Sequence, residues 1–523
     1  MSSLKAKMLR NKLEGKLGRA DDAGFLQLMW ATVIMQSGNS GPAMAFIKAP
    51  KEAITDDPRS RQIIRKWEIE TLINLLLTCP KAPAHRYAHH ELKKGIHQVL
   101  TIDNFDSVGS VINLLRDLEN AEHEGRISKE NILQELSRIA QRQFHWQGGG
   151  YFHPEAIRRT LFIYAHEDAK GYFEAKNGFT IDDLTLMGVG LTFEFMLKPW
   201  LMAPTYDILA SRKEALARVL AAVSLSIPAA RKTAVALRNE MIAATKGNLL
   251  TAHRPSILRQ HPLIQKADGA YIAPIPELLI QRATSGLYYD FIGDDAQGIR
   301  QQAAKRFELY VQELIPAYVE GVQCLEEQEI GLKRSRFLTP DVLVLSGDRI
   351  TVVIECKATK NTFSAQFAAD LAVGAKRGIN ELAKGVFQVW RFFAAVRRGV
   401  YTEHPVADEL HGMVVTMDDW LRLDTFVREK VVQEAHSIAD RYPEIEAEDR
   451  RSVVFSSAHQ LAETLARTDE KGWYTALTHA ATEKYQGYDL SAILEELGVE
   501  EKRKPFPFNM EEVMPWQREL PQS

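Results

Sequence analysis

The chain has 523 residues, of which 45% are hydrophobic and 25% charged, and its formal net charge is −3. A chain of this length is too long for one hydrophobic core and predicts about three or four folding units. No apolar run is long enough to span a bilayer, and residues 1–20 lack the apolar segment of a secretory signal, so we expect no membrane association. Cys79, Cys324 and Cys356 do not make a disulfide framework, which favours a reducing cytoplasm.

The pattern of residues 1–250 predicts a mostly α-helical region. Apolar residues recur at helical spacing after Asp56-Asp57-Pro58 and stop at Cys79-Pro80, and a second helical run follows Ser128. A third tract, rich in Ala, Leu and Arg, covers residues 205–245. No repeat period is strong enough to indicate a named solenoid. We therefore predict one α-helical domain or two subdomains, whose role the sequence leaves open.

The composition changes near residue 251. Residues 251–292 mix Pro, Gly and aromatic residues with short apolar runs, which predicts a linker with some strand character. Helical and strand patterns then alternate over residues 293–465. The expected elements are a helix over 294–318, a hairpin over 337–360, a helix over 377–398, a strand over 412–417, a helix over 419–435 and a strand over 452–456. This order predicts an α/β domain in which helices flank a central mixed sheet, followed by a helical and extended tail over 466–523.

The hairpin carries its charged residues at one end. Its two apolar strands, Val342–Leu345 and Ile350–Ile354, flank a turn cluster at 346–349. Asp341 precedes the first strand, and Glu355 and Lys357 close the second on the same face, because strand side chains alternate. A simple register therefore predicts that two carboxylates and one ammonium group converge at one edge of a small sheet.

This set of groups suits the hydrolysis of a phosphodiester. A hard cation such as Mg²⁺ prefers carboxylate and carbonyl oxygens, and it activates water while neutralising developing charge. Asp341 and Glu355 offer two carboxylates, and the backbone carbonyl of Cys356 offers a third oxygen at the same edge. Lys357 would orient or help deprotonate the attacking water and stabilise charge in the transition state.

Pro340-Asp341 followed by Glu355-Cys356-Lys357 resembles the motif of the PD-(D/E)XK nuclease superfamily, which has the restriction-endonuclease-like fold. The resemblance covers about residues 290–460 and does not extend to the first 250. It implies that Asp341 and Glu355 bind Mg²⁺ or Mn²⁺ and that Lys357 is the catalytic lysine. The expected fold is thus a helical region followed by a restriction-endonuclease-like domain.

The resemblance also implies functional residues on the two helices beside the hairpin. Nucleases of this kind often carry a metal-binding Glu on the preceding helix, where Glu308 is the first candidate and Glu313 the second. Many carry a polar or basic residue on the following helix, where Gln388 fits, with Lys384 and Arg391 on nearby turns.

Basic residues around the hairpin agree with an anionic partner. Residues 301–400 carry 14 Lys and Arg and 11 Asp and Glu, although the whole chain is acidic. Lys376, Arg377 and Lys384 lie on or near one predicted helix and would contact phosphates without reading sequence. The alternative for these residues is a solvated helix face.

The sequence therefore predicts a metal-dependent nuclease that hydrolyses DNA, with the helical region used for recognition or regulation. No GxxxxGK[ST] motif occurs, so no P-loop for ATP is expected. Analogy with the fold places the protein in bacterial or phage defence, restriction or repair. An RNA nuclease is one alternative, and a catalytically inactive protein that binds DNA or serves assembly is another. Cutting both strands of a duplex needs two sites, which favours a homodimer, and a partner protein on the helical region is a further expectation.

Overall fold

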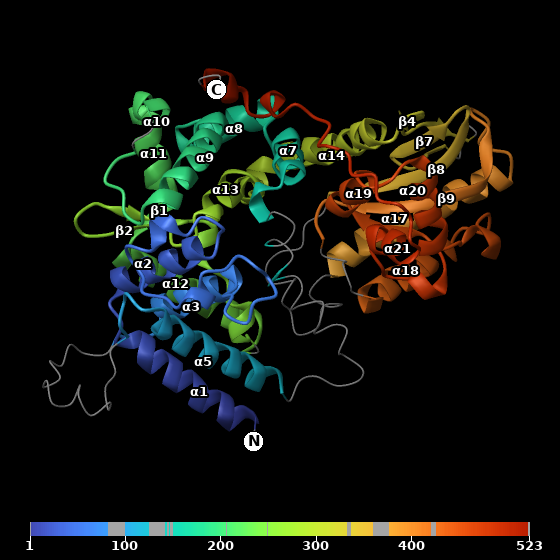
Figure 1. Ribbon diagram of the computed structural model, residues 1–523. Coiled ribbons are helices and arrows are strands. Elements are labelled where there is room, and N and C mark those ends of the chain that lie inside the picture. The colour runs from blue at the N-terminus through green and yellow to red at the C-terminus, as the bar shows by residue number, and fades with distance from the viewer. Residues whose placement is uncertain are drawn as a thin grey trace, which may run out of the picture.

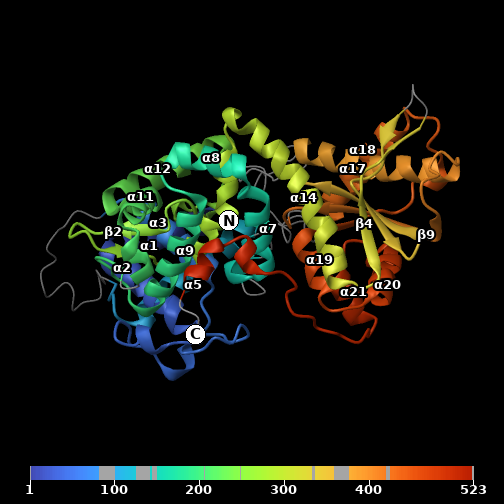
Figure 2. The same cartoon turned by 90° about the horizontal axis from the view of Figure 1, so that it is seen from above.

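The computed structural model describes residues 2–81, 100–124, 142–143, 146, 150–204, 207–247, 249–331, 336–358, 376–419 and 425–520. These residues form a helical lobe and an α/β lobe, which are joined by the long helix α14 and by the C-terminal segment (Figures 1 and 2). The expected layout of a helix-rich region with a helix-flanked mixed sheet is therefore observed. Within the described ranges, no helix has the length and apolar character needed to cross a membrane.

The helical lobe is built from helices that bury one face each. They are α1 (Ser2–Gly18), α2 (Asp22–Met35), α3 (Lys66–Thr78), α5 (Phe105–His123), α7 (Pro154–Tyr164), α8 (Glu167–Asn177), α9 (Ile181–Leu197), α10 (Asp207–Ser211), α11 (Lys213–Val223), α12 (Ile227–Ala244) and α13 (Glu277–Ala283). Local capping fixes several starts: the Asn104 side chain accepts from the amide of Asp106, and Thr180 and Asp183 form a capping box. The run predicted before Cys79 is α3, whereas most of the run predicted after Ser128 lies outside the described residues.

Residues 251–292 belong to the body of the helical lobe and do not form the predicted linker. Their strands are β2 (Leu263–Gln265) and β3 (Tyr271–Ile272), and β2 pairs in parallel with β1 (Ser224–Ser226). Leu263, Ile264 and the whole of α13 are buried. The Pro and Gly residues therefore mark turns inside a packed segment, because its short apolar runs supply part of the core.

The α/β lobe contains a five-stranded mixed sheet in the order β10-β9-β8-β7-β4. Its elements are α14 (Gln297–Tyr318), β4 (Val322–Glu326), β7 (Val342–Ser346), β8 (Arg349–Lys357), α17 (Lys376–Arg397), β9 (Val406–Thr416), α18 (Thr425–Ala439), β10 (Val454–Ser457), α19 (Ala458–Leu465), α20 (Glu470–Ala480) and α21 (Leu490–Glu496). A separate pair joins β5 (Glu329–Ile330) to β6 (Phe337–Leu338). Strands β8, β9 and β10 run parallel, whereas β7 is antiparallel to both β8 and β4. The three parallel strands consequently end at the same edge of the sheet.

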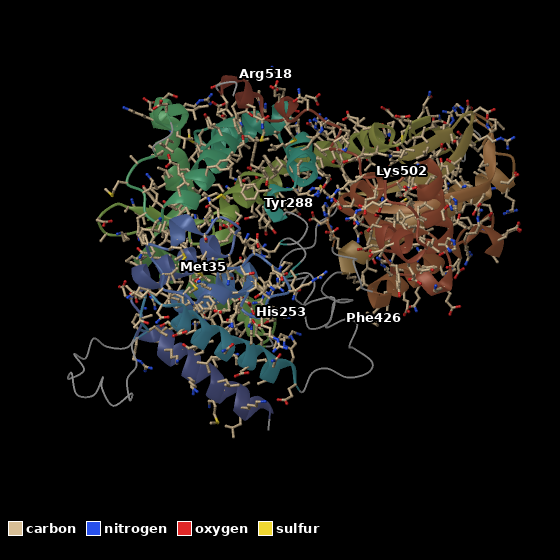
Figure 3. The ribbon with its side chains drawn as sticks, viewed as in Figure 1. Met35, His253, Tyr288, Phe426, Lys502 and Arg518 are labelled. Carbon is tan, nitrogen blue, oxygen red and sulfur yellow. The ribbon has the colours of Figure 1, made fainter. Side chains whose placement is uncertain are left out.

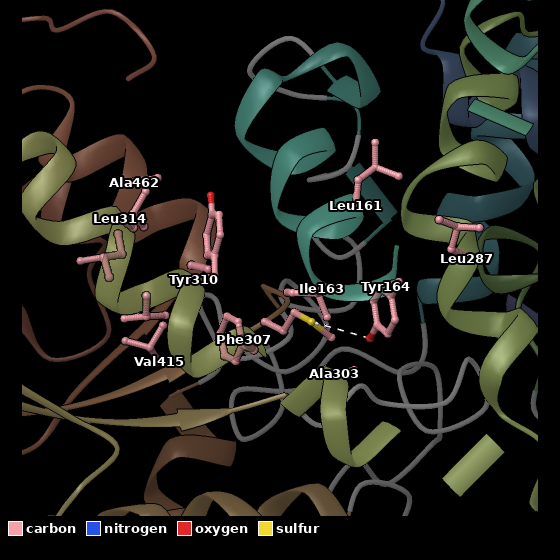
Figure 4. Packing of buried hydrophobic residues seen from close by; sticks show 14 of the residues in the cluster. Leu161, Ile163, Tyr164, Leu287, Ala303, Phe307, Tyr310, Leu314, Val415 and Ala462 are labelled. Carbon is pink, nitrogen blue, oxygen red and sulfur yellow. Dashed lines mark hydrogen bonds between the residues drawn. The ribbon is translucent and has the colours of Figure 1, made fainter. Parts of the chain in front are cut away.

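Two hydrophobic clusters cover the two faces of this sheet. Val352, Ile354 and Cys356 of β8 join a cluster with α14 and α19, whereas Val353 faces α17 and α18. The first cluster continues from the sheet through α14 into α7 (Figure 4) and includes residues of α9, so the two lobes share buried side chains. A continuous hydrophobic core thus holds α7 in a fixed position relative to the sheet.

The C-terminal tail returns from the α/β lobe to the helical lobe (Figure 1). It contains α20 and α21 and then an extended stretch, as the sequence predicts, with short 3₁₀ turns. Trp516 is buried on the helical lobe, where its indole nitrogen donates to Oγ1 of Thr185 over 3.0 Å. Arg212 pairs with Glu519 at 2.6 Å. The tail therefore fastens one lobe to the other.

Candidate active site

The hairpin β7–β8 brings Asp341, Glu355 and Lys357 together. Val342 pairs with Ile354, so Asp341 comes opposite Glu355 at the end of the hairpin away from its turn. The turn has Gly347 at φ 61°, a conformation that glycine adopts without strain. Oδ2 of Asp341 accepts a 2.7 Å hydrogen bond from the amide of Cys356. The strands are not in the simple register expected from the sequence: a bulge at Thr351, between the pairs Val344–Val352 and Leu345–Ile350, shifts the pairing by one residue and places Asp341 opposite Glu355. The expected convergence of the charged groups at this end is observed.

Asp341 is buried at this edge, with 8% of its surface exposed. Burial raises the pKa of its carboxyl to about 6, although the amide of Cys356 opposes the shift, and the negative charge of Glu308 raises it further. The backbone carbonyl of Asp341 accepts from Nε2 of Gln312 at 3.3 Å, which ties the start of β7 to α14. Asp341 thus holds a fixed position but lacks an adequate positive partner.

Glu355 is more deeply buried, with 1% exposed. Oε1 accepts a 2.6 Å hydrogen bond from Nζ of Lys357, whereas Oε2 has no hydrogen-bond partner among the described residues. Burial raises the pKa of Glu355 to about 8, the charge of Lys357 opposes the shift, and Asp341 adds to it. An orphaned carboxylate oxygen in a buried position is costly unless another group binds it.

Lys357 points to the same face as Glu355 and lies between β8 and α17. Its Nζ is also 3.4 Å from Oε1 of Gln388, the residue predicted on the following helix. Burial alone would lower the pKa of Lys357, but the carboxylate of Glu355 raises it above the ordinary value. Gly385 makes room for this arrangement, since a Cβ there would lie 3.0 Å from Cε of Lys357 and 3.1 Å from Cγ of Glu355.

Glu308 of α14 faces the same group of residues, whereas Glu313 does not. The charge of Glu308 acts on Asp341 and Glu355, and burial raises the pKa of Glu308 itself. Lys305 pairs with Glu308 at 2.9 Å and with Glu327 at 3.4 Å. Glu313 is turned toward Arg158 and is 46% exposed.

Glu327 is an acidic neighbour that the sequence pattern does not indicate. It follows β4, in which Glu326 pairs with Val342, and its charge acts on Asp341. The signal that points to it is the pairing of β4 with β7, and β4 is a strand that the sequence pattern did not predict.

The predicted basic residues occupy different environments. Lys376 and Arg377 are exposed at the start of α17. Lys384 is exposed and pairs with Glu381 at 2.9 Å. Arg391 stacks on the ring of Phe337, with the guanidinium carbon 3.9 Å from the ring centroid. Arg391 is therefore engaged inside the lobe, whereas the first turn of α17 is open to solvent.

A second polar cluster lies where α7 meets α19. His153, Glu155 and His459 each place one candidate ligand atom within 4.8 Å of the others. Both oxygens of Glu155 are already engaged: Oε1 accepts from Arg159 at 2.7 Å and from Tyr310 at 3.0 Å, and Oε2 lies 3.3 Å from Nδ1 of His459. Two imidazoles and a carboxylate suit zinc or iron better than magnesium, but the guanidinium on Glu155 opposes a further cation.

The protonation of this second cluster follows from its ion pairs. Burial would raise the pKa of Glu155, but Arg159 and His459 hold it well below its usual range. Burial would lower the pKa of His459, but the bond to Glu155 raises it above the ordinary value. The cluster is thus a buried ion-pair network between the lobes. Sequence spacing does not indicate it, because Glu155 and His459 are 304 residues apart.

The chemistry of the two clusters separates their roles. The Asp341–Glu355 edge offers carboxylate oxygens without enough donors, which is the donor set that a hard divalent cation prefers. No family model, no curated protein and no solved structure matches this chain. The geometry and chemistry of these residues are therefore the evidence for what the protein does.

Proposed function

We propose that this protein is a metal-dependent nuclease that hydrolyses phosphodiester bonds of DNA at the edge formed by Asp341, Glu355 and Lys357. The observation that carries the proposal is the uncompensated negative charge there. Four carboxyl groups, those of Asp341, Glu355, Glu308 and Glu327, interact electrostatically, and two lysines, Lys305 and Lys357, offset them. Among the groups described at this edge, two negative charges remain when all are ionised.

A divalent cation fits this imbalance. Oε2 of Glu355 lacks a partner among the described residues, and the pKa values of Asp341 and Glu355 are raised to about 6 and about 8 because their charges are buried. We propose that Asp341, Glu355 and the backbone carbonyl of Cys356 hold Mg²⁺ or Mn²⁺, with Glu308 as a further ligand. Bound there, the cation supplies a nucleophilic water and offsets negative charge on the phosphate.

The remaining chemistry falls to side chains of this chain. Lys357 donates to Glu355 and approaches Gln388, so its ammonium is held in one position beside the carboxylates. A fixed ammonium there orients the attacking water and stabilises charge that develops on the phosphate, with little reorganisation during the reaction. Gln388 restricts the lysine from the side of α17.

The arrangement of elements also supports a restriction-endonuclease-like fold. Helix α14, hairpin β7–β8, helix α17 and strand β9 follow one another, and helices cover both faces of the mixed sheet. This is the order that the resemblance to the PD-(D/E)XK superfamily implies. A role in defence against phage, restriction or repair follows from the same analogy and belongs to the proposal.

The test is a cleavage assay with the full-length protein. Wild-type protein is incubated with Mg²⁺ or Mn²⁺ and with DNA or RNA, and Asp341→Asn and Lys357→Ala are assayed beside it. Two control variants from the turn end of the same hairpin, Asp348→Asn and Arg349→Ala, remove one negative and one positive charge from exposed residues. We expect cleavage that requires the metal, that both site variants abolish, and that both controls retain.

Each outcome has a clear meaning. Cleavage that survives Asp341→Asn and Lys357→Ala would remove the site assignment. Nucleic-acid binding without cleavage under either metal would favour the alternative of an inactive nuclease-fold binding protein. Cleavage of RNA but not DNA would correct the substrate class while keeping the site.

A further inference from the structure

The helical lobe contacts the sheet edge directly beside the proposed catalytic lysine. The amide of Met417, which follows β9, donates to the carbonyl of Lys357 over 3.2 Å. From the helical lobe, Arg159 donates to the carbonyl of Met417 at 2.6 Å, and the hydroxyl of Tyr164 lies 3.8 Å from its sulfur (Figure 4). The residues of α7 thus border the site.

An aromatic series leads from this contact to the surface. The ring of Tyr164 meets that of Tyr288 with centroids 6.2 Å apart, and Tyr288 meets Tyr289 at 5.3 Å in an edge-to-face arrangement. Tyr288 lies on the side of the helical lobe that faces the α/β lobe (Figure 3). Tyr289 is 53% exposed, whereas Tyr288 is half-buried beneath it. The exposed ring of Tyr289 thus packs against the half-buried ring of Tyr288.

The backbone that carries Tyr289 is held in place. It belongs to the 3₁₀ helix η6 (Ser285–Phe291). Arg282 pairs with both carboxylate oxygens of Asp290 at 2.9 and 3.0 Å, and Lys176 donates to the carbonyl of Asp290 at 3.1 Å. Arg300 donates to the carbonyl of Phe291 at 2.8 Å. An exposed aromatic ring on a fixed backbone loses little conformational freedom when another ring stacks on it.

Charged residues of both signs lie near the same place. Burial and the negative charge of Asp418 raise the pKa of Tyr288, whereas Arg300 and Arg377, the latter at the exposed start of α17, lower it. Lys376 precedes Arg377 and is also exposed. Cations that contact phosphates and an aromatic ring that contacts bases are the two components of single-strand recognition.

We infer that Tyr289, supported by Tyr288, is a stacking platform for an unpaired base, and that the substrate reaches the proposed nuclease site with single-stranded character. This inference rests on the proposed function, since it concerns the substrate of the same edge. A base inside an intact duplex keeps its faces covered by its neighbours, so it cannot stack on a protein ring. DNA and RNA share this stacking chemistry, and the experiment separates them.

The experiment measures binding in a background that cannot cut. Fluorescence anisotropy is recorded with Asp341→Asn protein in Mg²⁺ and with a labelled single strand of DNA, a single strand of RNA and a blunt duplex of the same sequence. Tyr289→Ala, Tyr289→Phe and Tyr488→Ala are added singly. Tyr488 is the matched control: it is 49% exposed and stands edge-to-face on Tyr485 at 5.8 Å.

Loss of one base–aromatic stack is worth about 1–3 kcal/mol, which corresponds to about 5- to 150-fold in Kd. We expect Tyr289→Ala to weaken single-strand binding within that range, Tyr289→Phe to restore it, and Tyr488→Ala to leave it unchanged. Binding to the duplex should be weaker than binding to the single strand, and Tyr289→Ala should leave it unchanged. Melting curves of the exposed-site variants should match that of their Asp341→Asn parent.

Failure of this inference is distinguishable from failure of the proposed function. Unchanged single-strand binding by Tyr289→Ala overturns the platform even when the wild type cuts DNA. A loss that is equal for duplex and single strand also overturns it. If Tyr289→Ala weakens single-strand binding as expected but the wild type never cuts, the role of Tyr289 in binding stands and the proposed nuclease activity is overturned. Absence of any nucleic-acid binding overturns both.

Discussion

Gly385 offers the sharpest test of how the site is built. It lies on α17 against the two side chains that close β8, and a Cβ at this position would come 3.0 Å from Cε of Lys357 and 3.1 Å from Cγ of Glu355. Contacts this short force a neighbour to move by a few tenths of an ångström. The change Gly385→Ala therefore displaces the proposed catalytic lysine or its carboxylate partner without altering any polar group.

Two opposing terms set the stability of this variant. Replacing Gly by Ala inside a helix gains about 0.5–1 kcal/mol, while overpacking a filled site costs about 1–3 kcal/mol. We expect a net loss of at most about 2.5 kcal/mol in the free energy of unfolding. The effect on activity is larger in relative terms. A misplacement of about 1 Å can cost about 10²-fold in rate, so a shift of a few tenths of an ångström predicts a loss of about 4- to 10-fold in kcat.

The assay compares single-turnover cleavage and urea unfolding for Gly385→Ala and for Gly171→Ala. Gly171 is an exposed glycine inside α8 with no atom within 4 Å of a Cβ built there, so Ala should stabilise that helix and leave cleavage unchanged. Wild-type cleavage by Gly385→Ala would refute the claim that α17 positions Lys357 for the reaction. An equal loss in Gly171→Ala would show that the effect is not specific to the site.

Four further predictions concern the metal edge, the buried network between the lobes and the tail. Mg²⁺ should raise the melting temperature more at pH 8.5 than at pH 5. The raised pKa values of Asp341 and Glu355 mean that the metal-free folded protein binds more protons than the unfolded chain, so it loses stability as pH rises from about 4 to about 8. An equal shift of the melting temperature at both pH values would contradict this reasoning. Glu155→Gln should cost about 3 kcal/mol in urea unfolding at pH 7, since it leaves the buried guanidinium of Arg159 without its anion. The stability difference between wild type and His459→Ala should be full below pH 6.5 and shrink as pH rises through the raised pKa of His459, and a difference that grows with pH would refute the assigned charge. Trp516→Ala should release the C-terminal tail to limited proteolysis before global unfolding, because its ring is buried and its indole nitrogen bonds Thr185.

The sequence predicts the α/β lobe well because its signals are local. Period-two alternation in β8 places Glu355 and Lys357 on one face, and the Gly347 turn brings Asp341 to the same end of the hairpin. The exact pairing of Asp341 with Glu355 depends on the bulge at Thr351, which the sequence pattern does not indicate. The helices on either side of the hairpin follow from their 3.6-residue period. The predicted helix and the resemblance together indicate Glu308 as a site residue. In the structure, the charge of Glu308 acts on Asp341.

The remainder depends on contacts between distant parts of the chain. Residues 251–292 look like a linker because Pro and Gly interrupt their short apolar runs, whereas their burial and the pairing with β1 show that they belong to the core. Glu327 enters the site through β4, whose pairing with β7 the local pattern does not indicate. The network of Glu155 joins residues from opposite ends of the chain. Local periodicity does not indicate such contacts, because it reports the type of each element and not which distant element it packs against.

The two lobes meet at the edge of the sheet where β8, β9 and β10 end. The ends of β8 and β9 are joined where Met417 donates to Lys357, and α7 of the helical lobe binds that same Met417 through Arg159. Next along the edge, Ser457 begins α19, which presents His459 to Glu155 of α7. The helical lobe therefore anchors on the strand ends that neighbour the proposed lysine. Because α7 bonds Met417, a displacement of α7 would act on the strand next to Lys357. In the proposed nuclease, this contact would couple recognition by the helical lobe to cleavage at the sheet edge.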